Sequence, residues 1–277
     1  MQKIIDCRAR PNTPEYYSLL GGDGIKHIYA KTGHPYPEKP HTLDDFVNAF
    51  EAEGITSAVC TGRDMETTGQ WKVSNDYVAD LVAAKPGKII GLAGIDPHKG
   101  YLALQEIDRS INELHLKGIS LDPALVGLYP NDPKFFPIYQ KCQDMGIPVF
   151  ITIGPAPVGG GLKMSYGAPG PIDDVAADFP KLKILCSHGA FPYTQEMIAI
   201  AWRNDNVYFE PSIYIFMPGA AELIVKAANT IIGDKICFAS AFPFAPFSDV
   251  HRFKALGFSE EVLPLFFHDN AAKLLNL

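Results

Sequence analysis

Short apolar runs alternate with longer amphipathic segments along the whole chain, and this alternation constrains the fold more than any other feature. Short apolar runs are typical of buried parallel strands, and the segments between them are typical of crossover helices. Eight such pairs within 277 residues favour one closed α/β barrel, a single (β/α)8 TIM barrel over residues 1–277, rather than an open sheet. The predicted strands are Lys3–Ala9, Thr56–Thr61, Ile89–Ile95, Gly118–Leu121, Val149–Ile153, Ile184–Ser187, Val207–Glu210 and Ile236–Ser240.

Helix start and stop signals fall between the predicted strands. One helix is predicted to begin at Thr42 and end at Gly54, and another to begin at Asp132 and end at Gly146. The segment Glu260–Leu277 is expected to form closing helices. No interval is rich enough in Ser, Gly and Pro to be a linker, so the sequence predicts one domain.

Charge and composition narrow the class of partner. The net charge is -7 and Lys and Arg form no cluster, whereas nucleic acids and anionic membranes are bound by concentrated positive charge. We therefore expect neither partner, and a small molecule instead. The chain shows no secretory leader and no apolar run of membrane-spanning length, which favours a cytoplasmic location.

Five cysteines are widely spaced and form no C-x-x-C pair. Their odd number and their positions, mostly inside apolar runs, predict reduced and buried thiols rather than disulfides or a metal site. They are Cys7, Cys60, Cys142, Cys186 and Cys237.

Two long segments follow the first and fifth predicted strands, at Pro11–His41 and Gly154–Pro171. In a barrel, the active site lies at the carboxyl ends of the strands, so both segments are candidate lid loops. The alternative is that they are ordinary surface loops.

Polar side chains gather at the predicted strand ends. Because side chains alternate along a strand, Asp6, Arg8 and Arg10 are expected to point into the barrel, and Cys7 and Ala9 toward the helices. By the same rule, strand six should place Ile184, Cys186 and His188 on one face. The sequence thus predicts two guanidinium groups and one imidazole at the pocket floor.

Four strings carry a resemblance to a known family: Ile5-Asp6-x-Arg8-x-Arg10, then Asn131-Asp132-Pro133 through Tyr139 followed by Gly146-Ile147-Pro148, then Leu182 through His188-Gly189, and Asp269-Asn270-Ala271 near the end. In their order and spacing they resemble the amidohydrolase-related family, which includes lactonases, aromatic-acid decarboxylases and hydratases. The resemblance spans nearly the whole chain. It implies the same barrel fold.

The resemblance also implies where metal ligands would lie. The family's positions fall on Arg8, Arg10, Thr152, His188 and Ala241, and only His188 retains the residue type of the family. Arg cannot lose its proton to become a ligand, and Thr and Ala are poor substitutes for imidazole or carboxylate. We expect no metal. The sequence has no Gly-x-Gly-x-x-Gly or P-loop string either, so we expect no nucleotide cofactor.

Two arginines in place of a bound dication would keep the site positive, so the predicted ligand is a small carboxylate. Arg8 and Arg10 would bind the anion and stabilise oxyanion charge, with His188 as general acid or base. Alternatively, the arginines form internal ion pairs with Asp6, Asp122 or Glu210, and His188 is a remnant without a catalytic role. Further candidate substrate contacts are Arg63, His98, Asp122, Thr152, Tyr193, Glu210 and Ser240.

Three functional readings remain open. The leading expectation is a metal-independent, lactonase-like hydrolase acting on a small organic or aromatic acid. The neighbouring reading is a decarboxylase or hydratase, a lyase, on a similar substrate. The third is a catalytically inactive protein: an anion sensor, or the partner of a metal-bearing paralogue in a mixed oligomer. A homo-oligomer is equally compatible with the sequence.

Overall fold

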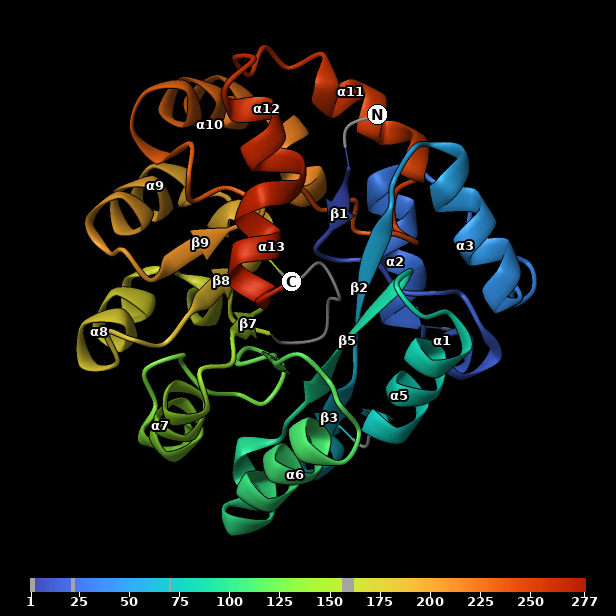
Figure 1. Cartoon of the computed structure of the whole chain (residues 1–277), viewed down its shortest axis with the longest axis vertical. Coiled ribbons are helices and arrows are strands. Elements are labelled where there is room, and N and C mark those ends of the chain that lie inside the picture. Colours follow the sequence, from blue (N-terminus) through green and yellow to red (C-terminus); the bar gives the residue numbers. More distant parts are fainter. Residues whose placement is uncertain (1–2, 21–22, 70, 156–161) are drawn as a thin grey trace.

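The computed structural model describes residues 3–20, 23–69, 71–155 and 162–277. Its main sheet has seven parallel strands in the order β1-β2-β5-β6-β7-β8-β9, surrounded by helices (Figure 1). The strands are β1 Ile5–Asp6, β2 Ser57–Thr61, β5 Ile89–Gly94, β6 Ile119–Leu121, β7 Val149–Ile151, β8 Ile184–Cys186 and β9 Val207–Phe209. Each lies inside a predicted strand, and the TIM-barrel architecture is confirmed.

The eighth predicted strand, Ile236–Ser240, closes the ring without forming a regular ladder. On one side the N–H of Cys237 donates to the carbonyl of Phe209 (3.0 Å), and on the other the N–H of Cys7 donates to the carbonyl of Phe238 (2.9 Å). One isolated bridge, between Phe209 and Ile236, joins this segment to β9, and a second bridge, between Ala9 and Phe242, lies just beyond it. The ladder is interrupted because the carboxylate of Asp6, not a backbone carbonyl, accepts from the N–H of Ser240 (3.0 Å).

The predicted helix signals are confirmed where they were clearest. Helix α3 (Leu43–Ala52) starts with a reciprocal capping box between Thr42 and Asp45. Helix α7 (Phe136–Met145) ends at Gly146 in the left-handed conformation. The remaining outer helices are α5 Asn75–Ala84, α6 Tyr101–Asn112, α8 Gly170–Asp178, α9 Thr194–Arg203, α10 Ala220–Ala227, α11 Val250–Lys254, α12 Val262–Pro264 and α13 Asn270–Leu275.

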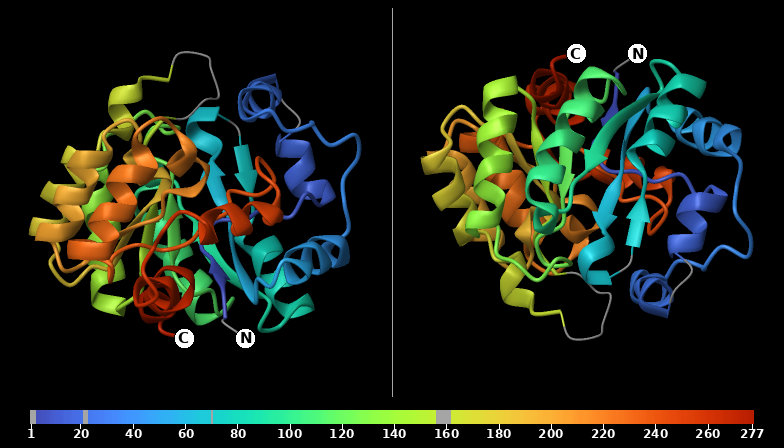
Figure 2. Two further views of the ribbon diagram at one scale, coloured as in Figure 1. Left: turned by 90° about the horizontal axis from the view of Figure 1, so that it is seen from above. Right: turned by 90° about the horizontal axis from the view of Figure 1, so that it is seen from below.

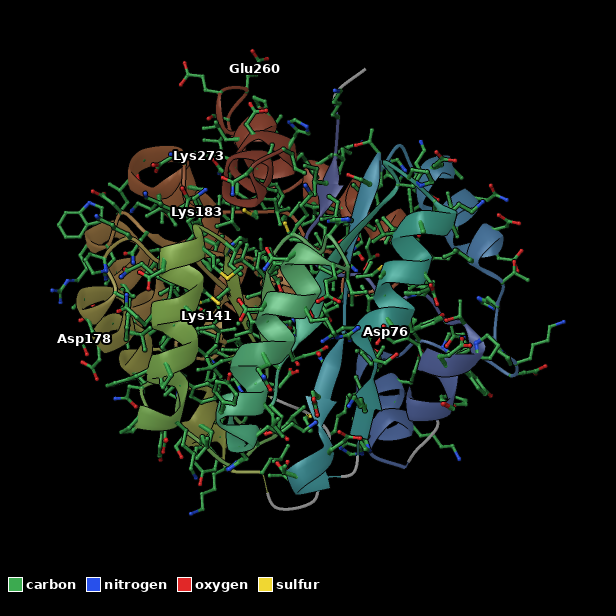
Figure 3. The ribbon with its side chains drawn as sticks, turned by 60° about the horizontal axis from the view of Figure 1, so that its bottom comes forward. Asp76, Lys141, Asp178, Lys183, Glu260 and Lys273 are labelled. Carbon is green, nitrogen blue, oxygen red and sulfur yellow. The ribbon has the colours of Figure 1, made fainter. Side chains whose placement is uncertain are left out.

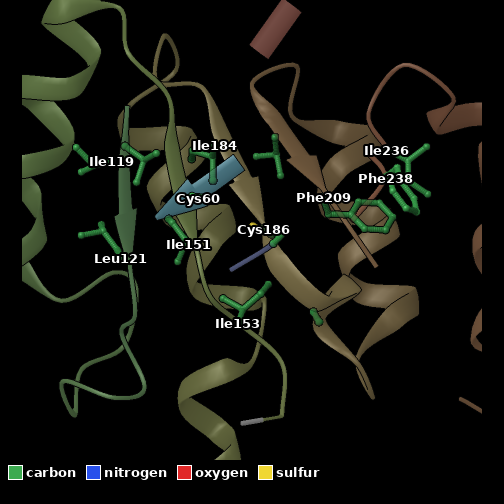
Figure 4. Packing of buried hydrophobic residues seen from close by; sticks show 14 of the residues in the cluster. Cys60, Ile119, Leu121, Ile151, Ile153, Ile184, Cys186, Phe209, Ile236 and Phe238 are labelled. Atoms are coloured by element: carbon green, nitrogen blue, oxygen red, sulfur yellow. The ribbon is translucent and has the colours of Figure 1, made fainter. Parts of the chain in front are cut away.

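Two apolar clusters fill the molecule. The larger one packs strand residues such as Ile151, Ile184 and Phe238 against the surrounding helices (Figure 4). The smaller one joins the opposite faces of the strands to α13. Because α13 lies across the centre of the ring in Figure 1, this second cluster is the barrel interior, which α13 closes at one end. Its members are Ile5, Cys7, Val59, Ile90, Leu92, Phe150, Leu185, Tyr208, Cys237, Ala239, Ala271, Leu274 and Leu275.

The interior cluster corrects two predicted orientations. Cys7 packs inside the barrel, not toward the helices, because it continues the inward face that starts at Ile5, and the alternation breaks only at the bend that follows, since Ala9 faces the helices. Ile184 and Cys186 belong to the helix-facing cluster, so they do not share a face with a pocket residue. The prediction of buried free thiols is confirmed for all five cysteines, and burial raises the pKa of Cys186 well above its ordinary value.

The segment after β1 is only partly a loop. Residues 11–41 contain α1 (Pro14–Leu20) and α2 (Asp23–Thr32), so the prediction of a plain loop is wrong for about half of it. Residues 154–171 contain a 3-10 turn at Met164–Gly167 and the start of α8, and 156–161 lie outside the described residues. Whether either segment acts as a lid stays a prediction.

A hairpin that the sequence pattern did not predict follows β2. Strands β3 (Arg63–Met65) and β4 (Trp71–Val73) pair antiparallel, with the short α4 (Glu66–Gly69) between them. Figure 2 shows the two termini at one end of the barrel and this hairpin at the other. The hairpin therefore extends the rim at the carboxyl ends of the strands.

Charged side chains point outward from the outer helices, as Asp76 of α5 and Asp178 of α8 illustrate in Figure 3. Within the described part of the chain, no helix is both long enough and apolar enough to cross a membrane.

Candidate active site

A cavity partly open to solvent lies at the carboxyl ends of the strands. This is the end at which TIM barrels hold their active sites. The polar lining comes mainly from strand ends, and the apolar lining from the hairpin, α2 and the loops after β7 and β9. The lining residues are Arg8, Arg10, Tyr16, Ile28, Arg63, Trp71, Lys72, Val73, Asp122, Ala124, Leu125, Thr152, Ile153, Gly154, Pro155, His188, Ile213, Tyr214, Ala241 and Phe244.

The backbone at three strand ends is in a conformation that non-glycine residues seldom adopt. His188 (φ 66°), Ser212 (φ 42°) and Ala241 (φ 62°) are all in the left-handed region. Such strain clusters at functional sites, where the surrounding structure imposes it. At His188 it has a direct effect, because the turn after β8 brings the imidazole into the pocket although Cys186 faces the helices.

Arg8 lies at the pocket floor and is only 6% exposed. Its guanidinium donates to the hydroxyls of Ser187 (2.8 Å) and Thr152 (3.2 Å), at the ends of β8 and β7. Both partners are neutral. Burial lowers the pKa of Arg8, although the charges of Glu210 and Asp122 act in the opposite direction.

Arg10 is 5% exposed, and its side chain has no hydrogen bond or ion pair among the described residues. Burial, together with the charges of Arg63 and Arg8, lowers the pKa of Arg10 well below its ordinary value. No described carboxylate oxygen lies within 4.0 Å of the guanidinium of Arg8 or Arg10. The alternative that these arginines form internal ion pairs with Asp6, Asp122 or Glu210 is therefore wrong for the described chain.

The third guanidinium of the pocket is paired. Arg63 contacts a carboxylate oxygen of Asp122 at 3.3 Å. Burial raises the pKa of Asp122, but the charges of Arg63 and Arg8 outweigh it and keep the pKa below its ordinary value. Asp122 is consequently ionised at neutral pH and neutralises one of the three arginines.

His188 is held from one side. Its Nδ1 lies 2.8 Å from the hydroxyl oxygen of Ser212, and its ring packs edge-on against Tyr214 at 5.0 Å between centroids. Burial, followed by the charges of Arg8, Arg10 and Arg63, lowers the pKa of His188 well below 6.5. The imidazole is therefore neutral at pH 7, and its Nε2 has no partner within the described residues.

Glu210 and Asp6 lie beneath the pocket and are fully buried. Burial raises the pKa of Glu210 to about 8, against the opposing influences of the charge of Arg8, the backbone of His188 and the hydroxyl of Ser187. Burial also raises the pKa of Asp6, one oxygen of which accepts from the N–H groups of Arg8 and Ser240. At neutral pH, Glu210 is mostly protonated and leaves the charge of Arg8 uncompensated.

Of the residues predicted for the site, the structure brings together Arg8, Arg10, Arg63, Asp122, Thr152 and His188 around the cavity.

The other four do not line it. Glu210 and Ser240 are buried below the floor, and His98 is occupied by the carbonyl of Val126, 2.9 Å from its Nε2. Tyr193 lines a separate surface pocket at the start of α9.

Several pocket residues were not predicted from the sequence. Ser187 and Ser212 orient Arg8 and His188, and a signal for Ser187 existed, because it follows Leu185 by two positions on the inward face of β8. Trp71 and Lys72 reach the pocket from the unpredicted hairpin, and Phe244 reaches it from the loop after Ala241. No periodic pattern marks these three.

The donor set does not fit a divalent cation. At the positions that the family resemblance implies for ligands, the cavity presents guanidinium, hydroxyl and methyl groups and one imidazole. The described residues include no group of three or more His, Cys, Asp or Glu side chains placed to hold a metal ion. Three guanidinium groups beside His188 would also repel a cation.

Comparison with known families identifies the class of protein. The family model described as amidohydrolase matches residues 5–277, nearly the whole chain. The chain belongs to this amidohydrolase family, as its sequence motifs implied.

Individual relatives place the chain within the family. A solved TIM-barrel protein of uncharacterized function from Bordetella bronchiseptica superposes with a TM-score of 0.87, at 30% identity over 99% of this chain and 98% of that one. The γ-resorcylate decarboxylase of a Polaromonas species is 21% identical over 244 residues, 74% of each chain. A 2-amino-3-carboxymuconate-6-semialdehyde decarboxylase from Dictyostelium discoideum is 36% identical, but over only 77 residues, 28% of this chain and 21% of the relative.

Proposed function

We propose that the protein is a lyase that removes CO₂ from a small carboxylic acid. Two curated relatives are named as decarboxylases of carboxylated substrates, which favours this reading over the lactonase-like hydrolase expected first. The cationic pocket is compatible with the same class of substrate. That the reaction proceeds without a metal is part of the proposal, and it is supported by the poor donor set.

One observation carries the proposal: Arg8 is buried beside a neutral imidazole and is held only by hydroxyl groups. A guanidinium that lacks a carboxylate partner binds an anionic oxygen through two parallel hydrogen bonds. Ser187 and Thr152 fix its orientation without neutralising it. The site is therefore prepared for the negative charge of a ligand.

These groups suit the electron flow of decarboxylation. When the C–C bond to the carboxylate breaks, its electron pair stays on the substrate and moves onto a conjugated oxygen. Arg8 would stabilise that oxygen, which is the preorganised electrostatic role that contributes most to many enzymatic rates. Before that bond breaks, neutral His188 would take a proton from a substrate hydroxyl and give it to the carbon bearing the carboxylate, which turns the oxygen into a carbonyl that can accept the electron pair. Solvent would then supply the one proton consumed overall, to the oxygen.

Hydrolysis remains the second candidate, because a neutral imidazole with a free nitrogen is also suited to activating water. In that reaction His188 would deprotonate the water and Arg8 would stabilise the tetrahedral oxyanion. The two reactions use the same residues but give different products.

The test uses purified protein with γ-resorcylate, other hydroxybenzoates and a matched set of carboxylated lactones. Products are followed by CO₂ release and by loss of the carboxylate or lactone signal in NMR spectra. We expect CO₂ release from at least one acid, and its loss in Arg8→Ala and His188→Asn. Ring opening of a lactone without CO₂ release would favour the hydrolase. Binding of acids without any turnover would favour the non-catalytic anion sensor.

A further inference from the structure

The cations around the pocket divide into paired and unpaired groups. Lys72, at the rim, contacts Glu66 at 2.8 Å, and Arg63 contacts Asp122 at 3.3 Å. Each therefore has a carboxylate partner on the protein. Neither Arg8 nor Arg10 has one among the described residues.

Two positive charges therefore remain for a ligand to neutralise. Glu210, the buried acid whose charge acts most on Arg8, is mostly protonated at neutral pH because burial raises its pKa to about 8. Buried charges are costly unless they are paired, so two uncompensated guanidinium groups in one pocket favour two anionic groups on the ligand.

The two guanidinium groups lie in one cavity but differ in their other neighbours. Arg8 bonds to the ends of β7 and β8, on the side of His188. Arg10 has Tyr16 of α1 and Tyr29 of α2 in its electrostatic surroundings and is free of hydrogen bonds. One anionic group would thus lie at the reactive side and the other at the side of the two N-terminal helices.

We propose that the substrate is a small dianion, with its reacting end at Arg8 and His188 and its second anionic group bound by Arg10. The walls between these ends are largely apolar and aromatic, with Trp71 and Phe244 among them, which fits a flat unsaturated body between the two charges. This inference rests on the proposed function and makes Arg10 the residue that determines specificity.

Calorimetric titration at pH 7 tests whether the site prefers a dianion to a monoanion, because the carboxyl groups of the probes are ionised there while Glu210 is still mostly protonated. The probes are benzoate and the three benzenedicarboxylates. In the wild type we expect at least one dicarboxylate to bind about tenfold or more tightly than benzoate. Arg10→Gln should remove that preference and keep benzoate binding. The control Lys141→Gln, which removes a cation paired with Asp108 outside the cavity, should keep the preference.

Stability without ligand gives an independent readout. Removing an uncompensated buried cation should raise the melting temperature of the ligand-free protein in Arg10→Met, which keeps the side-chain length and loses the charge. A fall in melting temperature would show that Arg10 has a structural partner and would overturn the proposal.

Two further results would overturn it: equal affinity of the wild type for benzoate and all three dicarboxylates, or a dicarboxylate preference that survives Arg10→Gln. If no probe binds, the pocket is not a carboxylate site, and the inference of a dianionic substrate is wrong as well. A preference for dicarboxylates without CO₂ release from any acid would overturn decarboxylation and leave the dianion site standing, so the two failures are distinguishable.

Discussion

At the end of the barrel that holds the termini, Leu274 and Leu275 of α13 pack against the interior strand residues. At the opposite end, Arg8 and Arg10 are equally buried but lack charge partners, and His188 is in a strained backbone conformation. At the first end the buried side chains are apolar and packed against one another. At the second end the buried guanidinium groups have no charge partner among the described residues. Stability should therefore depend on the α13 end, and ligand binding and chemistry on the arginine end, where the protein tolerates a local energetic cost.

The largest expected effect comes from Arg8→Ala. It should lower kcat/KM for CO₂ release by about a hundredfold to a thousandfold, about 3–4 kcal/mol, because it removes the donor to the developing negative charge. The free energy of unfolding, measured by urea denaturation, should stay the same or rise, because the lost group is an uncompensated cation. A variant that is both inactive and clearly less stable would contradict the claim that the arginine end serves activity and not stability.

The reciprocal change is Leu274→Ala in α13. It should lower the free energy of unfolding by about 2–5 kcal/mol by opening a cavity in the interior cluster. At a temperature where the variant is still folded, its kcat should match that of the wild type. Reduced kcat in the folded variant would mean that packing in the interior cluster affects the geometry of the pocket. Stability and activity would then not be divided between the two ends.

Glu210→Gln tests the arginine end through the pH dependence of the free energy of unfolding. The pKa of Glu210 is about 8 in the folded protein and ordinarily 4.5, so the folded state binds more protons in this range and wild-type stability falls as pH rises. Glutamine does not titrate. Between pH 6 and 7.5 the stability of the variant relative to the wild type should therefore rise by about 2 kcal/mol.

Urea denaturation at several pH values checks this result. Asp6 titrates in the same direction but is present in both proteins, so it cancels in the difference. Parallel stability curves for the two proteins between pH 6 and 7.5 would show that Glu210 is not the buried acid described here.

The smallest effect is expected for Ser212→Ala, which releases Nδ1 of His188. Loss of one positioning hydrogen bond should lower kcat by about tenfold or less and leave KM nearly unchanged. Ser165→Ala is a matched control, because Ser165 contacts Tyr129 on the surface, and it should leave both constants unchanged. Equal effects of the two substitutions on kcat would show that Ser212 does not position His188.

The sequence predicted most of the fold but only part of the site. The reason is physical: periodic patterns extend along strands and helices and stop where the site residues lie. Strands and capped helices such as α3 can be predicted from hydrophobic periodicity and from local capping residues. Alternation stops being informative near the end of each strand. Cys7 still shares the inward face of Ile5, but the bend at Cys7 and Arg8 ends the pattern, and the positive φ of His188 separates it from the face of Cys186.

The hairpin β3–β4 shows a second limit of the pattern. It interrupts the strand–helix alternation with two strands of three residues each, too short for a periodic signal. Trp71 and Lys72 therefore entered the pocket unpredicted. The arginines were found because they stand in the recognisable opening string, but only the structure shows that no described carboxylate pairs with them.

The central claim is that fixed guanidinium charge, not a bound metal, holds the carboxylate. The most direct measurement is a calorimetric titration with a carboxylate ligand of protein treated with chelator, dialysed, and divided into samples with and without added Mn²⁺. The account predicts the same affinity in both samples and no binding in Arg8→Ala. Binding that appears only with a stoichiometric divalent ion, and that persists in Arg8→Ala, would contradict it.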